Sequence, residues 1–543
     1  MKRKKELLVI LSSLLVIVLS VSVAYFTTKI LGEGKEISVE SADLKVIFTS
    51  GSGTINGTNI EPGWTSGENT FTVKNESNGT YNYNIIIKDL VNTFTTSGFL
   101  VYKITSADGG YNMTDFADVP KSSTAADTVL AENISIAKGV THTYKIIINY
   151  NNSDDVDQSA DMGKTLTGKI FITKGTEKPT LANKLLNDNP TISERTDFST
   201  PFTTNTANTL YKATENGTDV YYFAGQDTES TPINNWVKFG KYKSDLIKYR
   251  GYYSSTSTSY DEYSTMEECT SASKYNCTAY KYASAGDDMY WRIIRTNADG
   301  SIRLLYHGTS TTATDAYIGE SAFNANGDSP KYVGYMYGNT DATLEEARTN
   351  TNNSTIKTLI DNWYVSNMTS YTKYLSTTAV YCNDREVESG TYSATGSRFY
   401  YAAYTRAFTN RTPTYDCTND NDKYTVDAST GNGKLTYPIA LMTADEIAYA
   451  GGVRGEEAPM WYYTNSSLES STGSTEWWSL SPYYWVDGDA DSWYVGGSDY
   501  PGNLDNGLVY DVTGVRPAIS IKLDALWSSG DGSPENPYEI VYN

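Results

Sequence analysis

Histidine is almost absent from this chain, which has 543 residues but only two histidines, His142 and His307. Mechanisms that use histidine as an acid–base group or as part of a triad therefore have little support. A zinc site is disfavoured too, since the sequence contains no Cys-x-x-Cys and no His-Glu-x-x-His. The scarcity of histidine thus directs attention to binding rather than catalysis.

Positive charge is also scarce, with 43 Lys and Arg against 64 Asp and Glu, for a net charge of −21. No basic cluster follows the first five residues, so nucleic-acid binding is disfavoured, because neutralising phosphate supplies most of that affinity. The chain contains only 14 phenylalanines but 46 tyrosines. This profile is typical of strand-rich proteins with tyrosine on their surfaces, and not of helical bundles.

Cysteine is limited to four residues, all in the second half of the chain: Cys269, Cys277, Cys382 and Cys417. An even number in an exported chain predicts disulfides, and four cysteines allow three pairings. We favour the two local pairs, Cys269–Cys277 and Cys382–Cys417.

Residues 1–26 form a membrane-targeting segment, in which four basic residues precede the apolar run Leu7–Phe26. A signal peptide ends in small residues, here Ser22-Val-Ala24, whereas an uncleaved anchor needs about 20 apolar residues. Serines interrupt the run, so we favour cleavage after Ala24. Either alternative places the rest of the chain outside the cytoplasm, secreted or tethered to the cell surface, with membrane contact only through this segment.

The length predicts two or three domains. Residues 33–174 contain short β-branched strands separated by Ser, Gly, Asn and Asp clusters, which predicts a β-sandwich. Residues 175–204 are rich in Thr, Asn, Asp and Pro, with one short apolar stretch at Leu181–Leu186, and are predicted to be a linker that can contain a helical turn. Residues 205–543 form the second domain, in which residues 241–286 are interpreted as an insertion. The fold class expected is mainly β with minor α.

A family resemblance in the first domain rests on three short sequence segments: Glu61-Pro-Gly-Trp, Phe71-Thr-Val-Lys-Asn and Gly168-Lys-Ile-Phe-Ile. They resemble the TasA and camelysin family. The resemblance implies a jelly-roll-like exported domain that in some members builds fibres by donating an N-terminal strand, so a homo-oligomer or fibre is a possible assembly. We do not extend protease activity from this family to the chain, because the chain lacks the metalloprotease motif His-Glu-x-x-His.

Local signals in the second domain predict two hairpins and two helices. One hairpin joins Leu210 to Val220, and another joins the strands 291–295 and 302–306 across Asn-Ala-Asp-Gly. Helices are expected at Ser354–Tyr364 and Thr443–Ala450. The second helix has a capping box of Thr443 and Glu446 and a glycine stop.

Residues 476–520 differ at their ends and in their middle. The ends, Trp477-Trp-Ser-Leu-Ser-Pro and Gly514-Val-Arg-Pro-Ala, are apolar and predict scaffold strands, with Trp477 and Trp478 in the core and Arg516 in a structural ion pair. The middle, 483–511, is composed of Tyr, Trp, Asp, Asn, Gly and Ser, the composition of a binding face. The predicted ligand contacts are Tyr483, Tyr484, Trp485, Asp487, Tyr494, Asp499, Tyr500 and Asn503. The alternative is a set of exposed loop residues on a small twisted sheet.

Asp487-Gly-Asp-Ala-Asp491 spaces three carboxylates as in the first half of a calcium loop. However, Ser492 and Ser498 stand where an EF-hand needs glycine and glutamate. Calcium held by Asp487, Asp489 and Asp491 is therefore one hypothesis, and solvated acids on a turn the other. No other cofactor is expected.

The two end motifs, together with Tyr290-Trp-Arg-Ile-Ile-Arg and Leu441-Met-Thr-Ala-Asp-Glu-Ile, resemble a lectin-like module. This module belongs to the C-type-lectin and formylglycine-generating-enzyme fold group and occurs in secreted proteins of Gram-positive gut bacteria. The same pattern closes the variable proteins diversified by retroelements. The resemblance implies a C-type-lectin-like α+β domain whose residues 483–511 vary. Formylglycine-generating enzymes use a cysteine pair near the C-terminus, and this chain has none after Cys417.

The expected function is that of an exported, adhesin-like binding protein that recognises a glycan or a protein and is not an enzyme. One alternative is a fibre-forming structural protein. A second is an extracellular carbohydrate-active hydrolase, which needs two close carboxylates in a cleft. The neighbours Asp445 and Glu446 are better explained as a helix cap and surface charge than as a catalytic pair of carboxylates.

Overall fold

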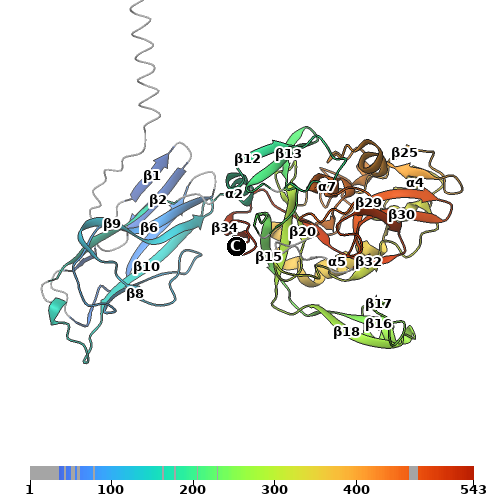
Figure 1. The fold of residues 1–543 in the computed structure, drawn as a ribbon. Helices are drawn as coiled ribbons and strands as arrows, with labels where there is room; N and C mark the ends of the chain where they lie inside the picture. Colours follow the sequence, from blue (N-terminus) through green and yellow to red (C-terminus); the bar gives the residue numbers. More distant parts are fainter. Residues whose placement is uncertain are drawn as a thin grey trace, which may run out of the picture. The chain divides into compact units, whose positions relative to one another are not determined.

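A computed structural model describes residues 36–41, 44–50, 55–57, 62–76, 80–161, 164–175, 179–204, 206–228, 230–463 and 475–542. Strands hold 39% of the residues and helices 14%, which confirms the predicted mainly β class with minor α. The chain forms two compact units, Met1–Lys178 and Pro179–Asn543 (Figure 1). The targeting segment 1–26 lies outside the described residues. In the part that is described, no helix is both long and apolar enough to cross a membrane.

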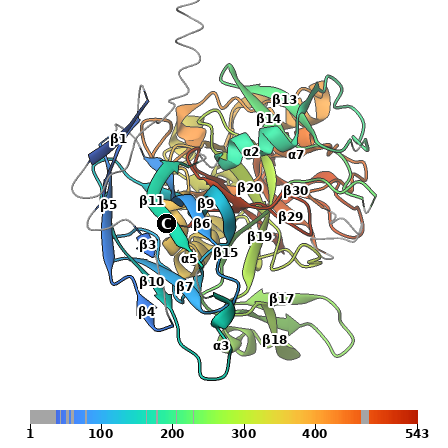
Figure 2. The same cartoon turned by 90° about the vertical axis from the view of Figure 1, so that its left-hand side faces the viewer.

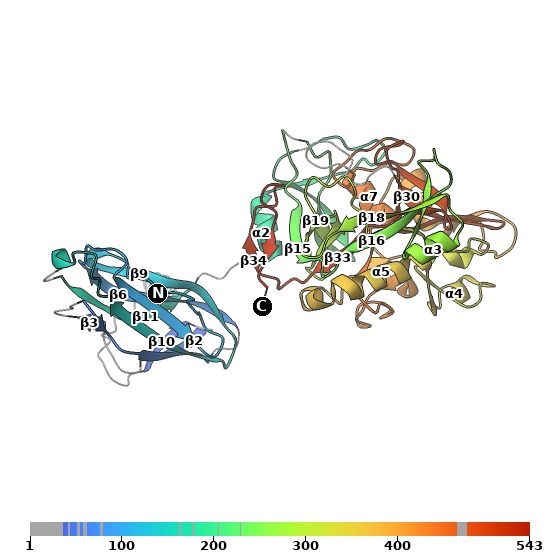
Figure 3. The ribbon, with the colours of Figure 1, turned by 90° about the horizontal axis from the view of Figure 1, so that it is seen from below.

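The first unit contains two antiparallel sheets. One has the order β1 (Glu36–Ser41), β2 (Leu44–Ser50), β5 (Asn69–Asn75), β10 (Thr141–Tyr150), β7 (Leu100–Ser106) and β8 (Ala117–Asp118), with β4 (Trp64–Thr65) beside β10. The other has the order β3 (Ile55–Gly57), β11 (Leu166–Lys174), β6 (Tyr81–Asn92) and β9 (Ser122–Ile136) (Figure 3). Burial alternates along β10, as expected for a strand with one face in a core. Ile85 of β6 and Ile146 of β10 belong to the same buried cluster, so the two sheets pack as a sandwich.

The segment predicted as a linker is instead part of the second unit from residue 179 onward. Helix α2 (Leu181–Asp188) begins after its N-cap Thr180 and buries Leu181 and Leu185 in the core of that unit. Strand β12 (Thr191–Glu194) then pairs in parallel with β13 (Thr209–Glu215). Helix α2 covers the apolar stretch 181–186, where the prediction allowed a helical turn, and its leucines at i and i+4 lie on one buried helix face.

The second unit is built on two larger sheets. One has the order β12, β13, β14 (Thr218–Tyr222), β19 (Asp288–Thr296), β20 (Ile302–Tyr306), β33 (Pro517–Ile521) and β28 (Ile439–Leu441), with β15 (Trp236–Lys241) beside β19. The other has the order β21 (Glu320–Ala322), β32 (Val512–Gly514), β29 (Trp477–Val486), β26 (Phe399–Tyr401) and β25 (Val387–Ser389), with β30 (Asp489–Val495) beside β29 and β31 (Leu504–Leu508) beside β30. Both predicted hairpins are confirmed, as β13–β14 and β19–β20.

Short strand pairs and helices complete this unit. The pairs are β22 (Met336–Tyr337) with β23 (Asn352–Asn353), β24 (Tyr381–Cys382) with β27 (Lys423–Tyr424), and β34 (Trp527–Ser529) with β35 (Glu539–Ile540). Besides α4 (Leu344–Ala347), the two predicted helices are confirmed as α5 (Thr355–Asn367), with Ser354 as N-cap, and α7 (Ala444–Ala450). Helix α7 has the expected capping box and ends at Gly451, whose positive φ of 120° suits glycine.

The segment interpreted as an insertion, 241–286, forms a sheet of its own. Its strands are β16 (Leu246–Tyr252), β17 (Tyr260–Tyr263) and β18 (Asn276–Ala283), and α3 (Met266–Ser271) lies between β17 and β18 (Figure 2). The Cys269–Cys277 disulfide joins α3 to β18, and the second disulfide is Cys382–Cys417. Both predicted pairings are confirmed, and two disulfides indicate an oxidising, extracellular environment.

Candidate binding face

The predicted binding face 483–511 is the antiparallel meander of β29, β30 and β31. Three of its predicted contacts are wrong, because Tyr483, Trp485 and Asn503 are only 5%, 1% and 4% exposed. Alternation along β29 turns Tyr483 and Trp485 inward and leaves Tyr484 outward. The Asn503 side chain accepts a hydrogen bond from the backbone N–H of Gly455 (2.8 Å) and so holds a turn.

The other predicted contacts reach the surface, but at separate places. Asp487 lies on the exposed turn between β29 and β30, and Asp499 and Tyr500 follow β30 on an exposed turn. Tyr484 pairs in register with Asp491, and the part-exposed Tyr494 pairs with Trp478 farther along the hairpin. The predicted residues therefore do not form one continuous contact surface.

The calcium hypothesis for Asp487, Asp489 and Asp491 is not supported by their geometry. Asp491 is buried and accepts a hydrogen bond from the Asn506 amide (2.7 Å), while Asp487 is exposed on the turn. Burial raises the pKa of Asp491 to about 6. Among the described residues, no three His, Cys, Asp or Glu side chains are grouped to hold a metal ion.

For the scaffold strands beneath the face, the prediction is confirmed for the two tryptophans and wrong for Arg516. Trp477 and Trp478 are fully buried. Arg516 is buried as well, but it donates to the carbonyl oxygens of Tyr306 (3.1 Å) and Tyr462 (2.5 Å) and lies over the Trp477 ring. A third hydrogen bond joins Arg516 to the His307 ring (3.4 Å), so its partners are two carbonyl groups and an imidazole rather than the carboxylate that the ion-pair prediction required. Burial lowers its pKa to about 9.

An aromatic surface that the sequence analysis missed lies beside Tyr484. Strand β26 pairs with β29 so that Tyr400 is opposite Tyr484. The chain then continues through α6 (Ala402–Tyr404) and the π-helix Thr405–Asn410. Tyr400 belongs to β26, whereas Tyr404 and Phe408 lie four residues apart in the helical segment that follows, a spacing that places side chains on one face. We call Tyr484, Tyr400, Tyr404 and Phe408 the aromatic stripe.

The rings of the aromatic stripe contact one another in sequence. Tyr484 and Tyr400 are 5.8 Å apart, Tyr400 and Tyr404 stack at 4.0 Å, and Tyr404 and Phe408 are 5.3 Å apart. The three tyrosines are partly exposed and Phe408 is 37% exposed. The local signal in the sequence is the spacing of Tyr404 and Phe408, whereas the pairing of Tyr400 with Tyr484 has no local signal.

Three arginines flank the aromatic stripe. Arg398 lies over the Tyr484 ring at 5.1 Å, and Arg411 and Arg454 lie over Phe408 at 5.5 and 4.9 Å. Burial and the charge of Arg454 lower the pKa of Arg411. Arg454 pairs with Asp505 at 3.5 Å and donates to the Asn506 side chain at 3.4 Å. A chain of net charge −21 thus presents cationic groups around these rings.

The segment that carries the aromatic stripe is fixed from below. Arg406 of the π-helix donates two hydrogen bonds to Asp445 (2.9 and 2.7 Å) and pairs with Asp384 at 2.7 Å. The Cys382–Cys417 disulfide closes the loop around the whole segment. Asp445 is therefore buried in an ion pair, and the prediction that it is surface charge is wrong. Fixed aromatic groups of this kind can bind with little loss of side-chain entropy.

Comparisons with known proteins add little to this geometry. No family model matches the chain, and no curated protein matches it. Among solved structures, a Paenibacillus xanthan lyase gives a TM-score of 0.14 at 10% identity, covering 48% of this chain. The chain spans 23% of the length of that lyase. A likeness this weak carries no argument about fold or function.

Proposed function

We propose that this chain is an exported binding protein that recognises a protein ligand through the aromatic stripe. The observation that carries the proposal is the joining of Tyr484, from one segment, to Tyr400, Tyr404 and Phe408, from another, with arginines around them. Tyrosine and arginine are among the residues that dominate protein–protein binding energy. Both disulfides and the N-terminal targeting segment support export.

Ring geometry favours a protein over a glycan at this place. Tyr400 and Tyr404 stack with an interplanar angle of 25°, so one of the two faces of each ring is covered by the other ring. A sugar ring needs a free aromatic face, whereas protein side chains also pack on ring edges and hydroxyl groups. The aromatic stripe therefore suits the side chains of a protein partner.

The test is binding of the purified chain to arrays of host proteins and of glycans. Replacing Tyr400, Tyr404 and Phe408 with alanine should lower the affinity for a protein ligand at least tenfold, since hot-spot truncations cost about 2 kcal/mol or more. The matched control is Tyr253→Ala with Tyr275→Ala, which removes two rings that are 57% and 66% exposed just after β16 and just before β18. Equal affinity of both variants would contradict the proposal, and so would binding to glycans alone through these rings.

The family resemblances remain proposals alongside this function. If the lectin-like module is the correct relative, variation among close relatives should concentrate at 484 and at the exposed turns of 487–511, and spare the buried Trp485 and Asn503. Fibre assembly through the N-terminal unit and carbohydrate hydrolysis stay predictions. Size-exclusion chromatography and assays on polysaccharides would test them directly.

A further inference from the structure

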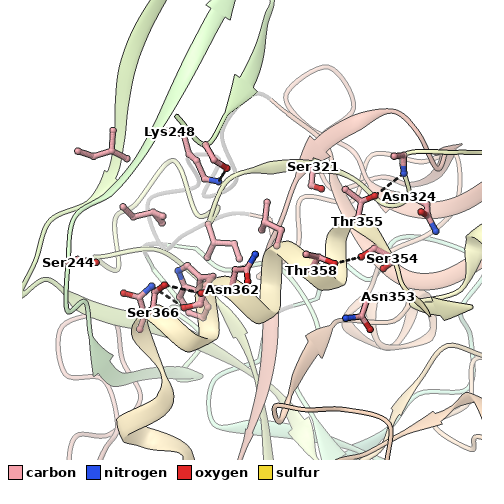
Figure 4. Close-up of a pocket in the computed structure, with 18 of the residues that line it drawn as sticks. Ser244, Lys248, Ser321, Asn324, Asn353, Ser354, Thr355, Thr358, Asn362 and Ser366 are labelled. Carbon is pink, nitrogen blue, oxygen red and sulfur yellow. Dashed lines mark hydrogen bonds between the residues drawn. The ribbon is translucent and has the colours of Figure 1, made fainter. Parts of the chain in front are cut away.

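A cavity of about 690 Å³ lies on the second unit, away from the aromatic stripe. One wall is helix α5, and the opposite wall is the start of β16 in the inserted sheet, from Ser244 to Lys248 (Figure 4). The remaining wall comes from residues 321–326 and the β22–β23 pair. This volume falls within the range of small-ligand sites, about 300–1,000 Å³.

The cavity is lined by neutral groups that form hydrogen bonds. Twelve of its 21 lining residues are Ser, Thr or Asn, and only Asp245 and Lys248 carry charge. Asp245 is already paired with Lys281 at 2.6 Å and accepts a backbone hydrogen bond from Ala285 (2.9 Å). Lys248 donates to the Ser264 hydroxyl (3.4 Å). A charged ligand would therefore find few free counter-charges here.

One face of α5 supplies the polar groups. Thr355, Thr358, Asn362 and Ser366 follow one another along the helix at spacings of three and four residues and line the cavity (Figure 4). Thr358 and Ser366 donate their hydroxyl hydrogens to backbone carbonyl groups of the helix, at 3.0 and 2.9 Å. Their oxygen lone pairs remain available, whereas the Thr355 hydroxyl already accepts from the Ala325 backbone N–H (2.9 Å), so Thr358 and Ser366 are the hydroxyl acceptors on this wall.

A buried acceptor on the adjoining, buried face of α5 has no hydrogen-bond partner among the described residues. Asn367 lines the cavity and is 3% exposed, and its amide nitrogen donates to the Trp363 carbonyl (3.1 Å). Its Oδ1 atom has no hydrogen-bond partner among the described residues. A buried acceptor without a partner costs about 1–3 kcal/mol, so its presence beside a cavity points to a ligand that donates to it.

We infer that this cavity binds a short neutral oligosaccharide, with the acceptors of α5 receiving hydrogen bonds from the sugar hydroxyls. Leu359 and Trp363 of the same helix supply apolar contact for the C–H faces of the sugar. The inserted sheet then has a role, since it provides the wall that faces α5. This site is separate from the aromatic stripe and does not depend on the proposed protein ligand.

The test titrates the full chain with neutral trisaccharides of glucose, galactose, mannose and N-acetylglucosamine, followed by saturation-transfer NMR. Asn367→Leu keeps the side-chain size and removes the acceptor, and should weaken binding at least tenfold. Thr358→Trp places a large ring at an exposed position of the wall and should abolish binding without disturbing the core. The matched control is Val365→Thr, at a position on the same helix that is 47% exposed and lies outside the cavity.

Failure of all four sugars to bind at millimolar concentration would overturn the inference. Binding that survives both cavity variants would overturn it as well, and so would binding of sialylated or sulfated trisaccharides alone. The alanine variant of the aromatic stripe should bind the sugar normally. Loss of sugar binding in that variant would place the site on the stripe, so the two proposals can fail separately.

Discussion

Glu446 shows how much one carboxylate can do when it is buried. It caps its own helix by accepting from the Thr443 N–H (2.9 Å), and it pairs with Arg295 (2.9 Å) and Arg303 (3.1 Å). The sequence predicts the cap, because the capping box is local. It does not predict the arginines, which come from β19 and β20, or that the Glu446 side chain is only 1% exposed.

Glu446→Gln should therefore lower the free energy of unfolding by about 3–5 kcal/mol, because Arg303 would be left buried beside a neutral group while Arg295 would keep only Glu215 (3.0 Å). Urea unfolding measures this change. The control is Glu345→Gln, whose carboxylate pairs with Arg348 at 3.7 Å on a side chain that is 71% exposed. An exposed pair contributes little, so the control should change stability by less than about 1 kcal/mol. Equal effects in the two variants would contradict the assigned role of Glu446.

At the scale of elements, the inserted sheet is joined to the rest of its unit through carboxylates. Glu262 of β17 accepts hydrogen bonds from the Glu320 backbone N–H (2.9 Å) and from the Tyr282 hydroxyl (2.6 Å). Glu320 of β21 accepts from the Tyr260 hydroxyl (2.7 Å). Burial, followed by the charge of Glu262, raises the pKa of Glu320 to about 7 from its ordinary 4.5, although Arg250 is nearby.

The raised pKa gives the docking of this sheet a pH dependence. The protonated form of Glu320 is favoured in the folded state. Its contribution to the free energy of unfolding is therefore fully present below about pH 4.5 and is lost as the pH rises through 7. The loss is on the order of 3 kcal/mol. Glu320→Gln stays neutral and can still accept from Tyr260, so its stability should fall less between pH 5 and pH 8. An equal loss of unfolding free energy in the two proteins between pH 5 and pH 8, measured by urea unfolding, would refute this.

Elements held by local signals were predictable, and those held by pairing across the chain were not. Helices α5 and α7 and the β19–β20 hairpin follow from caps, spacing and turn residues within a short stretch. The aromatic stripe depends on β26 pairing with β29, which lies far along the sequence. Composition alone marked 483–511 as a face, but strand alternation decided that Trp485 points inward.

The whole molecule is two units, and the chemistry that stabilises them differs. Both disulfides belong to the unit Pro179–Asn543. The sandwich of the first unit is held by its apolar core and by hydrogen bonds such as that between the Tyr83 hydroxyl and His142 (2.8 Å).

Calorimetry of the full chain should show two unfolding transitions, and a reducing agent should lower the temperature of one of them only. Removing a disulfide that closes a loop typically costs about 2–4 kcal/mol. The sandwich unit has no cysteine and serves as the internal control. A single transition, or two that shift equally on reduction, would show that the units do not unfold separately.

The distribution of tryptophan makes this comparison possible by optical means. Of the ten tryptophans, Trp64 alone belongs to the unit Met1–Lys178. Trp236, Trp291, Trp461, Trp477, Trp478, Trp485 and Trp493 are fully buried in the other unit. Indole emission shifts to the red when the ring meets water, so intrinsic fluorescence reports almost entirely on the second unit. Far-ultraviolet circular dichroism reports on both, and the difference between the two signals isolates the sandwich without a label or a truncation.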